Sequence, residues 1–389
     1  MKKNNEAITN EAWNMKLQGQ GLIQEDFQYF TSEIENFTNN LNFDDSFKTG
    51  NIPFISSCLE KNLLEIAKSA LLSNAKRIRP LFCFWTLRTL YNQDNKNYSE
   101  LFTTVNKIAL AIEILHNASL IIDDIEDGSE ERRHKVSLHI QYGLPNALNT
   151  GSWMYFLALN QLPPKVQVLA SKALLDCHVG QALDLSSNQK YFSEHLFSLS
   201  ENERWMFYEN CVELKTTRLM LLSLECLKEV LSMSQKDYLI LQKILKKYGI
   251  LFQIFDDLKN IFPELSGNKC QEDLKTGLRS AISIEFLNLL SPKEKEEAFE
   301  NFKQNNFFEF MTTNTKYIQA VQNCFLKSEM LLKETELYLD QYITGKTLLR
   351  FYISHLFESP FYEVRNKIST KLNEKFFTYQ ESTQYHENY

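Results

Sequence analysis

The chain has 389 residues, of which 43% are hydrophobic and 23% are charged, and its net charge of −7 argues against a broad nucleic-acid surface. With only 11 Gly and 8 Pro it has few turn-forming residues, which favours long helices over a sheet-rich fold. No apolar run approaches the ~20 residues of a membrane span, and seven widely spaced Cys without a CxxC pair are typical of a reducing compartment, so we expect a cytoplasmic protein.

Residues 1–55 are predicted to form an N-terminal extension with one amphipathic helix. Residues 1–20 are polar and mixed, which indicates a loose arm. From Ile23 to Leu41 the apolar residues recur at alternating intervals of four and three, which is one face of a helix. This face could form a dimeric coiled coil, but three heptads are short for one, which favours docking on the chain's own body. The Asn-rich residues 39–51 indicate a linker.

Helical periodicity dominates from Leu63 onward, and no period-2 alternation is long enough to predict a sheet. Capping-box spelling predicts helix starts at Ser200, Ser234 and Ser291, where a side-chain oxygen can accept an unpaired N–H of the first turn. The composition does not shift along the chain and no repeat is visible. Residues 56–389 are therefore expected to form a single all-helical domain.

Three short segments with basic residues are candidates for binding an anionic ligand. Lys76–Pro80 (KRIRP) is expected to close an early helix, Arg132 and Arg133 form a pair, and Lys215–Thr216 lies in an otherwise apolar helix. Arg offers a planar fork for phosphate and Lys a compact charge. Each segment alone is more typical of solvated surface cations.

An acidic cluster precedes the Arg pair. Asp123 and Asp127 are four residues apart and share a helix face, with Asp124 beside them. Such a run is usually a solvated face. The alternative is a site for a hard divalent cation, since Mg²⁺ takes one or two carboxylates and bridges to substrate phosphates.

A second cluster favours the metal interpretation. Asp256 and Asp257 repeat the spacing, and Asn260 stands where a third carboxylate could be. Two such turns on facing helices of a bundle could together hold several Mg²⁺ around a diphosphate, with the basic segments as further ligands.

These residues resemble the motifs of the trans-type isoprenyl diphosphate synthases, which include farnesyl and geranylgeranyl diphosphate synthases. LHNASLIIDDIEDGSEERR at 115–133 resembles the first aspartate-rich motif with its Arg pair, and FQIFDDLKN at 252–260 resembles the second, in a variant ending in Asn. Three shorter segments follow the order of the family: KRIRP at 76–80, HVGQALD at 178–184 and KT at 215–216.

The resemblance implies an all-α antiparallel helical bundle around a deep central cavity, usually a homodimer. The enzyme would be a prenyltransferase that condenses an allylic prenyl diphosphate with isopentenyl diphosphate. The implied catalytic residues are Asp123, Asp124, Asp127, Asp256, Asp257 and Lys215. The implied ligands of Mg²⁺, as three ions with substrate bound, are Asp123, Asp127 and Asp256. The positions that match ligands of the allylic diphosphate are Arg132, Lys215, Thr216, Gln253 and Lys269.

Isopentenyl diphosphate would bind the remaining matched positions, which are Lys76, Arg79, His116 and Arg133. A lone His on an apolar helix is more often a core residue. His116, however, lies two turns before Asp123 and on the same face, and the family match favours ligand binding.

The second half of the site departs from the family pattern. Leu278 stands where the family has a Lys after Gly, so that Arg279 or Lys275 would have to compensate. Two rival functions therefore stay open: a terpene synthase that ionises the allylic diphosphate without isopentenyl diphosphate, and a non-catalytic partner subunit.

The residues one helical turn before Asp123 bear on product length. Ser119 and Ala118 are small, whereas a Phe or Tyr there would close the bottom of the cavity and limit its depth. We therefore predict geranylgeranyl diphosphate (C20), with farnesyl diphosphate (C15) as the alternative. A floor could also come from a neighbouring helix, through Trp153, Tyr155 or Phe156.

Overall fold

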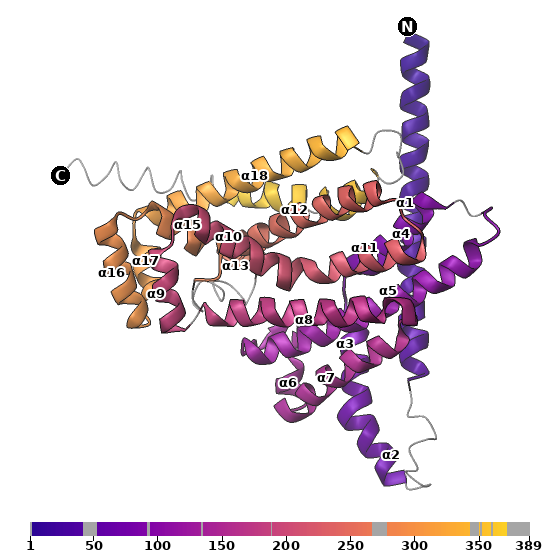
Figure 1. Ribbon diagram of the computed structural model, residues 1–389, viewed down its shortest axis with the longest axis horizontal. Coiled ribbons are helices and arrows are strands. Elements are labelled where there is room, and N and C mark those ends of the chain that lie inside the picture. Colours follow the sequence, from indigo (N-terminus) through magenta and orange to yellow (C-terminus); the bar gives the residue numbers. More distant parts are fainter. Residues whose placement is uncertain are drawn as a thin grey trace. The chain divides into compact units, whose positions relative to one another are not determined.

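The computed structural model of the protein describes residues 2–41, 53–91, 94–133, 135–187, 189–266, 278–342, 350, 352–358 and 361–371 (Figure 1). Nearly all of them are helical, which confirms the all-α fold. The elements up to the centre of the chain are α1 (Lys2–Asn39), α2 (Pro53–Leu59), η1 (Glu60–Leu64), α3 (Glu65–Leu71), α4 (Ile78–Leu90), α5 (Tyr98–Glu126), β1 (Glu131–Arg132), β2 (Lys135–Val136), α6 (Leu138–Gln141), α7 (Leu144–Gln161) and α8 (Pro164–Ser186).

The second half of the chain continues in the same way. Its elements are α9 (Lys190–Ser198), α10 (Glu201–Val212), η2 (Glu213–Thr217), α11 (Arg218–Val230), α12 (Gln235–Lys259), α13 (Pro263–Ser266), α15 (Ala281–Leu289), α16 (Pro292–Lys303), α17 (Phe307–Thr313), α18 (Lys316–Tyr342) and η4 (Ser354–Glu358). The elements η1, η2 and η4 are π-helical turns. Within the described ranges, no helix is both long and apolar enough to cross a membrane.

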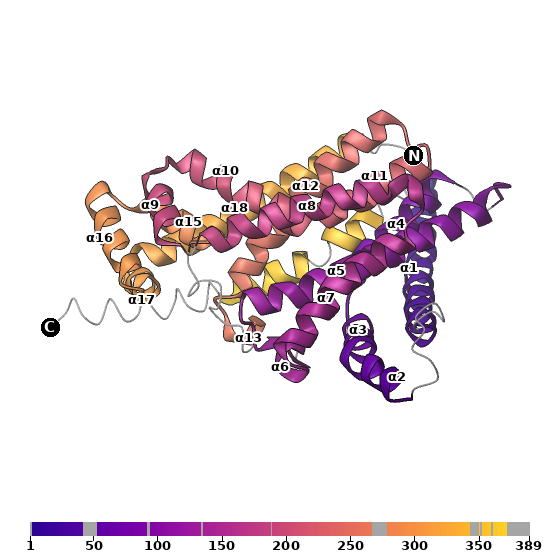
Figure 2. The same ribbon diagram turned by 60° about the horizontal axis from the view of Figure 1, so that its bottom comes forward.

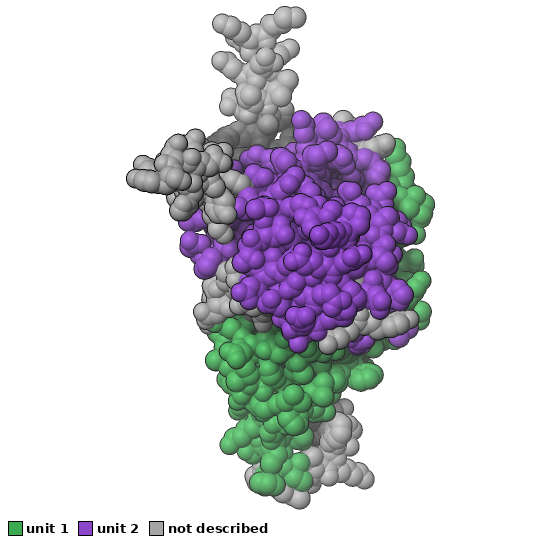
Figure 3. Space-filling view, turned by 90° about the vertical axis from the view of Figure 1, so that its left-hand side faces the viewer, with its two compact units in different colours: residues 1–173, 219–239, 345–352 green, residues 174–218, 240–344, 353–389 purple. Residues whose placement is uncertain are grey.

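The chain divides into two compact units, which are coloured separately in Figure 3. Unit 1 comprises Met1–Ala173, Leu219–Leu239 and Gly345–Tyr352, and unit 2 comprises Leu174–Arg218, Ile240–Thr344 and Ile353–Tyr389. Neither unit is continuous in sequence, because the chain passes from one to the other inside α8, α11 and α12 and twice more after α18. The single domain over residues 56–389 stays a prediction.

The core of unit 1 is built around α5, which packs against α4 and α7 (Figure 2). The contact with α7 is close at Gly151, where an added Cβ would lie only 2.8 Å from Ile122 Cδ1. Trp153, Tyr155 and Phe156 therefore lie on a helix next to the first acidic cluster, as predicted.

Helix α1 docks on unit 1, which confirms the predicted docking. Phe30 and Ile34 are fully buried. The buried Asp26 accepts hydrogen bonds from Trp85 Nε1 (3.1 Å) and Arg88 Nε (3.0 Å) of α4. The loose arm expected over residues 1–20 was wrong, since α1 begins at Lys2. Once the docked part of a helix is nucleated, each further residue adds a backbone hydrogen bond, and no Pro interrupts this stretch. Most of the predicted linker, residues 42–50, lies outside the described residues.

The segment KRIRP begins a helix instead of closing one, which corrects the prediction. Helix α3 ends at Leu71 and α4 begins at Ile78, so Pro80 lies in the first turn, where a missing N–H costs nothing. Arg77 precedes the helix in the left-handed conformation (φ 51°).

In unit 2, α15 packs against both α10 and α18. The predicted helix starts are confirmed: α10 and α16 begin with complete capping boxes at Ser200 and Ser291, and Ser234 Oγ accepts the N–H of Asp237 at 3.1 Å.

Candidate active site

The first acidic turn lies at the C-terminal end of α5 in unit 1. Asp123 and Asp124 belong to the last helical turn, and the N–H of Asp127 donates to the carbonyl of Asp123 at 2.9 Å. Gly128 then adopts a positive φ of 66°, which lets the chain reverse direction into the β1–β2 hairpin. The hairpin, which the sequence did not predict, returns Arg132 to the end of the helix.

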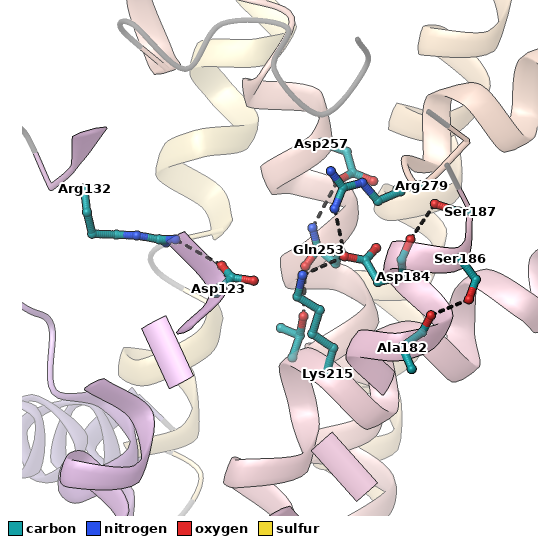
Figure 4. A network of polar contacts seen from close by, with 11 residues as sticks. Asp123, Arg132, Ala182, Asp184, Ser186, Ser187, Lys215, Gln253, Asp257 and Arg279 are labelled. Carbon is teal, nitrogen blue, oxygen red and sulfur yellow. Dashed lines mark hydrogen bonds and ion pairs between the residues drawn. The ribbon is translucent and has the colours of Figure 1, made fainter. Parts of the chain in front are cut away.

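Arg132 joins the two adjacent carboxylates. Its Nη2 donates to Asp123 Oδ2 at 3.0 Å (Figure 4). Its Nε donates to Asp124 Oδ1 at 2.8 Å. A planar guanidinium can bind two acceptors at once, and here it offsets the repulsion between neighbouring negative charges. The predicted phosphate ligand Arg132 is thus held beside the predicted metal ligand Asp123.

A cluster of cations surrounds His116 on the same helix. Burial lowers the pKa of His116 well below its usual value of 6.5, and the nearby charges of Arg79, Arg133, Arg132 and Arg77 lower it further. The imidazole is therefore neutral at pH 7. The predicted isopentenyl diphosphate ligands His116, Arg79 and Arg133 thus lie close enough to act on one another electrostatically.

A buried ion pair fixes the backbone next to these cations. Arg77 is bound to Glu113 of α5, and its Nη2 also donates to the carbonyl of Leu71 at 2.5 Å. Asn117 Nδ2 donates to Glu113 Oε1 at 3.1 Å. The flanking Lys76 is exposed and Arg79 is half-buried. The sequence did not single out Glu113 or Asn117, since their contacts depend on tertiary structure.

The second acidic turn, in unit 2, separates its two carboxylates by environment. Asp256 is 45% exposed and pairs with Lys259 Nζ at 2.5 Å. Asp257 is 3% exposed and accepts hydrogen bonds from Tyr208 Oη (2.9 Å), the Ala281 N–H (2.7 Å) and Gln253 Nε2 (3.1 Å). Burial and the charge of Asp257 raise the pKa of Tyr208 well above 10, so the phenol stays a donor.

These contacts give the two carboxylates different capacities. Asp256 faces solvent and could bind a cation. Asp257 is enclosed by three protein donors and anchors the beginning of α15. The catalytic role predicted for Asp257 stays a prediction, and its surroundings favour positioning over metal binding.

The predicted phosphate ligands Lys215 and Thr216 lie on the π-helical turn η2 in unit 2. Lys215 Nζ contacts Asp184 Oδ2 at 2.7 Å, and Arg279 Nη1 contacts the same oxygen at 3.0 Å (Figure 4). Thr216 Oγ1 donates to Gln253 Oε1 at 3.0 Å. Two cations thus share one carboxylate oxygen.

The sequence assigned no role to Asp184, although HVGQALD at 178–184 was part of the resemblance. Leu278 is fully buried, and Arg279 instead presents its guanidinium next to Lys215. Lys269 and Lys275 lie outside the described residues.

The donor set suits Mg²⁺ only in combination with phosphate. Among the described residues, no three His, Cys, Asp or Glu side chains come together as a metal site. Mg²⁺ requires just one or two carboxylates and completes its octahedron with waters and phosphate oxygens. Asp123, Asp127 and Asp256 are partly accessible hard oxygen donors and fit this requirement.

The chain is similar in sequence to several known proteins. Geranylgeranyl pyrophosphate synthase paxG of Penicillium paxilli is 32% identical over 203 residues, which are 48% of this chain and 51% of that protein. The geranylgeranyl pyrophosphate synthase of Mucor circinelloides f. lusitanicus is 32% identical over 234 residues, 54% and 72% of the two chains. The matched region thus spans about half the length of the first relative.

Solved structures share the fold. A polyprenyl synthase from Caulobacter crescentus, complexed with calcium and isoprenyl diphosphate, has a TM-score of 0.62 at 19% identity over 88% of this chain and 96% of that one. The geranylgeranyl pyrophosphate synthase from Lactobacillus brevis has a TM-score of 0.63 at 17% identity, over 87% and 97%. The sequence model of the polyprenyl synthetase family matches residues 60–318. The chain belongs to the polyprenyl synthetase family.

Proposed function

We propose that the protein condenses an allylic prenyl diphosphate with isopentenyl diphosphate to give a longer trans-prenyl diphosphate, and that this product is geranylgeranyl diphosphate. The relatives named as geranylgeranyl pyrophosphate synthases support this assignment. The main supporting observation is that each half of the site combines carboxylates with cations. In unit 1, Arg132 forms an ion pair with Asp123 of the first acidic turn. In unit 2, Lys215 and Arg279 both form ion pairs with Asp184.

The allylic diphosphate would bind at these charged side chains and replace the protein groups that they contact in its absence. Asp123, Asp127 and Asp256 would hold Mg²⁺, which when bound neutralises the diphosphate leaving group as a Lewis acid. Arg132, Lys215, Thr216 and Gln253 would bind the diphosphate oxygens, and Arg279 would add the charge that Leu278 lacks. Preorganised cations of this kind stabilise the negative charge that develops as the allylic C–O bond breaks.

Isopentenyl diphosphate would bind Lys76, Arg79, Arg133 and His116. The neutral imidazole of His116 can donate one hydrogen bond to a phosphate oxygen without adding to the repulsion among the arginines. The double bond of this substrate then attacks the allylic cation, and a proton leaves to the departing diphosphate. Apolar residues of α5 would keep water from the cation.

The small residues before Asp123 support a C20 product. Ala118 is buried, and Ser119 Oγ donates to the carbonyl of His116 at 2.8 Å, so its side chain occupies little space beyond the helix. On the neighbouring helix, Phe156 is 71% exposed, which does not suit a residue that closes a cavity within its own unit.

Helix α7 supports a homodimer. It exposes Leu144, Leu148 and Phe156, which repeat at four- and eight-residue intervals on one face. A second copy of the chain would cover this apolar face. The cytoplasmic location stays a prediction that cell fractionation can test.

The test uses the purified protein with Mg²⁺, each allylic diphosphate in turn, and isopentenyl diphosphate present or absent. A longer diphosphate that forms only with both substrates supports the proposal. Hydrocarbon or alcohol from the allylic substrate alone would identify a terpene synthase. Turnover only after another subunit is added would identify a non-catalytic partner.

A further inference from the structure

In the π-helical turn η2, two adjacent side chains contact two different helices. It interrupts the helix formed by α10 and α11, and Thr217 Oγ1 donates to the carbonyl of Val212, five residues earlier, at 3.3 Å. Lys215 reaches Asp184 of α8, and Thr216 reaches Gln253 of α12. π-Helical turns are rare, and those that interrupt an α-helix frequently lie at functional sites.

A glycine of α8 packs closely against the backbone of this turn. A Cβ added to Gly180 would lie 2.7 Å from the carbonyl carbon of Leu214 and 2.7 Å from the backbone nitrogen of Lys215. Both are main-chain atoms, so no side-chain rotation could relieve the overlap. Any residue larger than Gly at position 180 must therefore shift the turn or α8.

A glycine of α12 packs closely against another residue of the same turn, Thr217. A Cβ added to Gly249 would overlap Thr217 Oγ1 and lie 2.9 Å from Thr217 Cβ and Cγ2. Thr217 is buried and cannot turn away freely. Here the obstacle is a side chain, and substitution by Ala would remove two of its three obstructing atoms, Oγ1 and Cγ2.

Glycine inside a helix is unfavourable relative to Ala, so two helical glycines against one turn need a physical reason. We propose that Gly180 and Gly249 are positioning residues: they let α8 and α12 approach η2 closely enough for Lys215 and Thr216 to be held in the geometry that binds diphosphate. This inference rests on the proposed function, in which Lys215 and Thr216 bind the allylic diphosphate.

The first experiment measures Gly180→Ala and Gly249→Ala against the wild type. Steady-state kinetics should show KM for the allylic diphosphate raised about tenfold to a hundredfold, the size of a lost charged hydrogen bond, with KM for isopentenyl diphosphate nearly unchanged. Calorimetric titration with inorganic pyrophosphate and Mg²⁺ should show the same loss without requiring turnover. Gly21→Ala, at a helical glycine with no atom within 4 Å of the added Cβ, is the matched control and should match the wild type in both assays.

The second experiment asks whether removing the obstacle restores binding. Thr217→Ala in the Gly249→Ala background removes Oγ1 and Cγ2 but keeps Cβ, 2.9 Å from the added methyl group, so pyrophosphate affinity should recover in part. It should not recover in the Gly180→Ala background. Two unrelated defects would instead add. Equal increases in KM for both substrates would overturn the proposal. So would a loss of pyrophosphate affinity in Gly249→Ala that Thr217→Ala leaves unchanged, or a double variant that circular dichroism shows to be unfolded. A wild type that binds pyrophosphate without elongating a substrate would refute the proposed function and leave this test intact.

Discussion

At the scale of single residues, Arg132 depends on the shape of its side chain as well as on its charge. It binds Asp124 through Nε and Asp123 through Nη2. Arg132→Lys keeps the charge but loses this fork, so we expect KM for the allylic diphosphate to rise about tenfold. Arg365→Lys is a matched control, because Arg365 binds Glu329 through the same two nitrogens outside the site. Equal kinetics for Arg132→Lys and wild type would contradict the role.

His116 predicts a dependence of stability on pH. Its pKa in the folded protein lies well below 6.5, so under mildly acidic conditions the unfolded chain binds a proton that the folded chain does not. The contribution of His116 is therefore present above pH 6.5 and is lost as the pH falls below it. We expect the urea midpoint to drop between pH 7.5 and 5.5 by more in wild type than in His116→Gln. Equal drops would show that folding does not lower the pKa of His116.

Ser119 predicts the length of the product. Ser119→Phe would add an aromatic ring one turn before Asp123, at ~1.5 Å of helix rise per residue, and should shorten the main product from C20 to C15. Chromatography of the dephosphorylated products measures the change. Ser99→Phe, at the first turn of the same helix, is the control and should leave the product unaltered. An unchanged product from Ser119→Phe would remove the argument from cavity depth.

At the scale of elements, helix α1 is predicted to depend on one buried carboxylate. Asp26 is 2% exposed and is the acceptor for both Trp85 and Arg88. Asp26→Asn leaves Arg88 without its counter-charge, and breaking a buried pair costs about 3–5 kcal/mol. A calorimetric scan should show a clearly lower Tm, while Glu25→Gln, at the exposed neighbouring position, should leave it unchanged. A small change for Asp26→Asn would show that apolar packing alone docks α1.

The elements also show how far the sequence could predict the structure. Capping boxes are local, so the helix starts at Ser200 and Ser291 could be read correctly. The π-helical turn η2 could not, because the residues packed against it, Gly180 and Gly249, are distant from it in sequence. Nor could the Arg132 contacts, since they require the reversal at Gly128. The motifs identify which residues gather in each half of the site, while the partners that hold them, such as Asp184, emerge only from packing.

At the scale of the whole molecule, the proposed function requires both acidic turns to serve one ligand. Mg²⁺ with inorganic pyrophosphate should then raise the Tm of the wild type, because a ligand that binds only the folded state stabilises by about 2.7 kcal/mol at a hundred times its Kd. EDTA should abolish the shift. Asp123→Asn, in unit 1, and Asp256→Asn, in unit 2, should each remove most of it, and the double variant should lose little more.

The coupling between the two substitutions is what distinguishes a shared site from two separate ones. Residues that act on one ligand give non-additive losses, whereas independent sites give losses that add. Asp237→Asn is a suitable control, because this carboxylate lies at the exposed start of α12 and should leave the Tm shift intact. If Asp123→Asn and Asp256→Asn each removed half of the shift, the two turns would bind separate ions, and the proposed synthase mechanism would lose its basis.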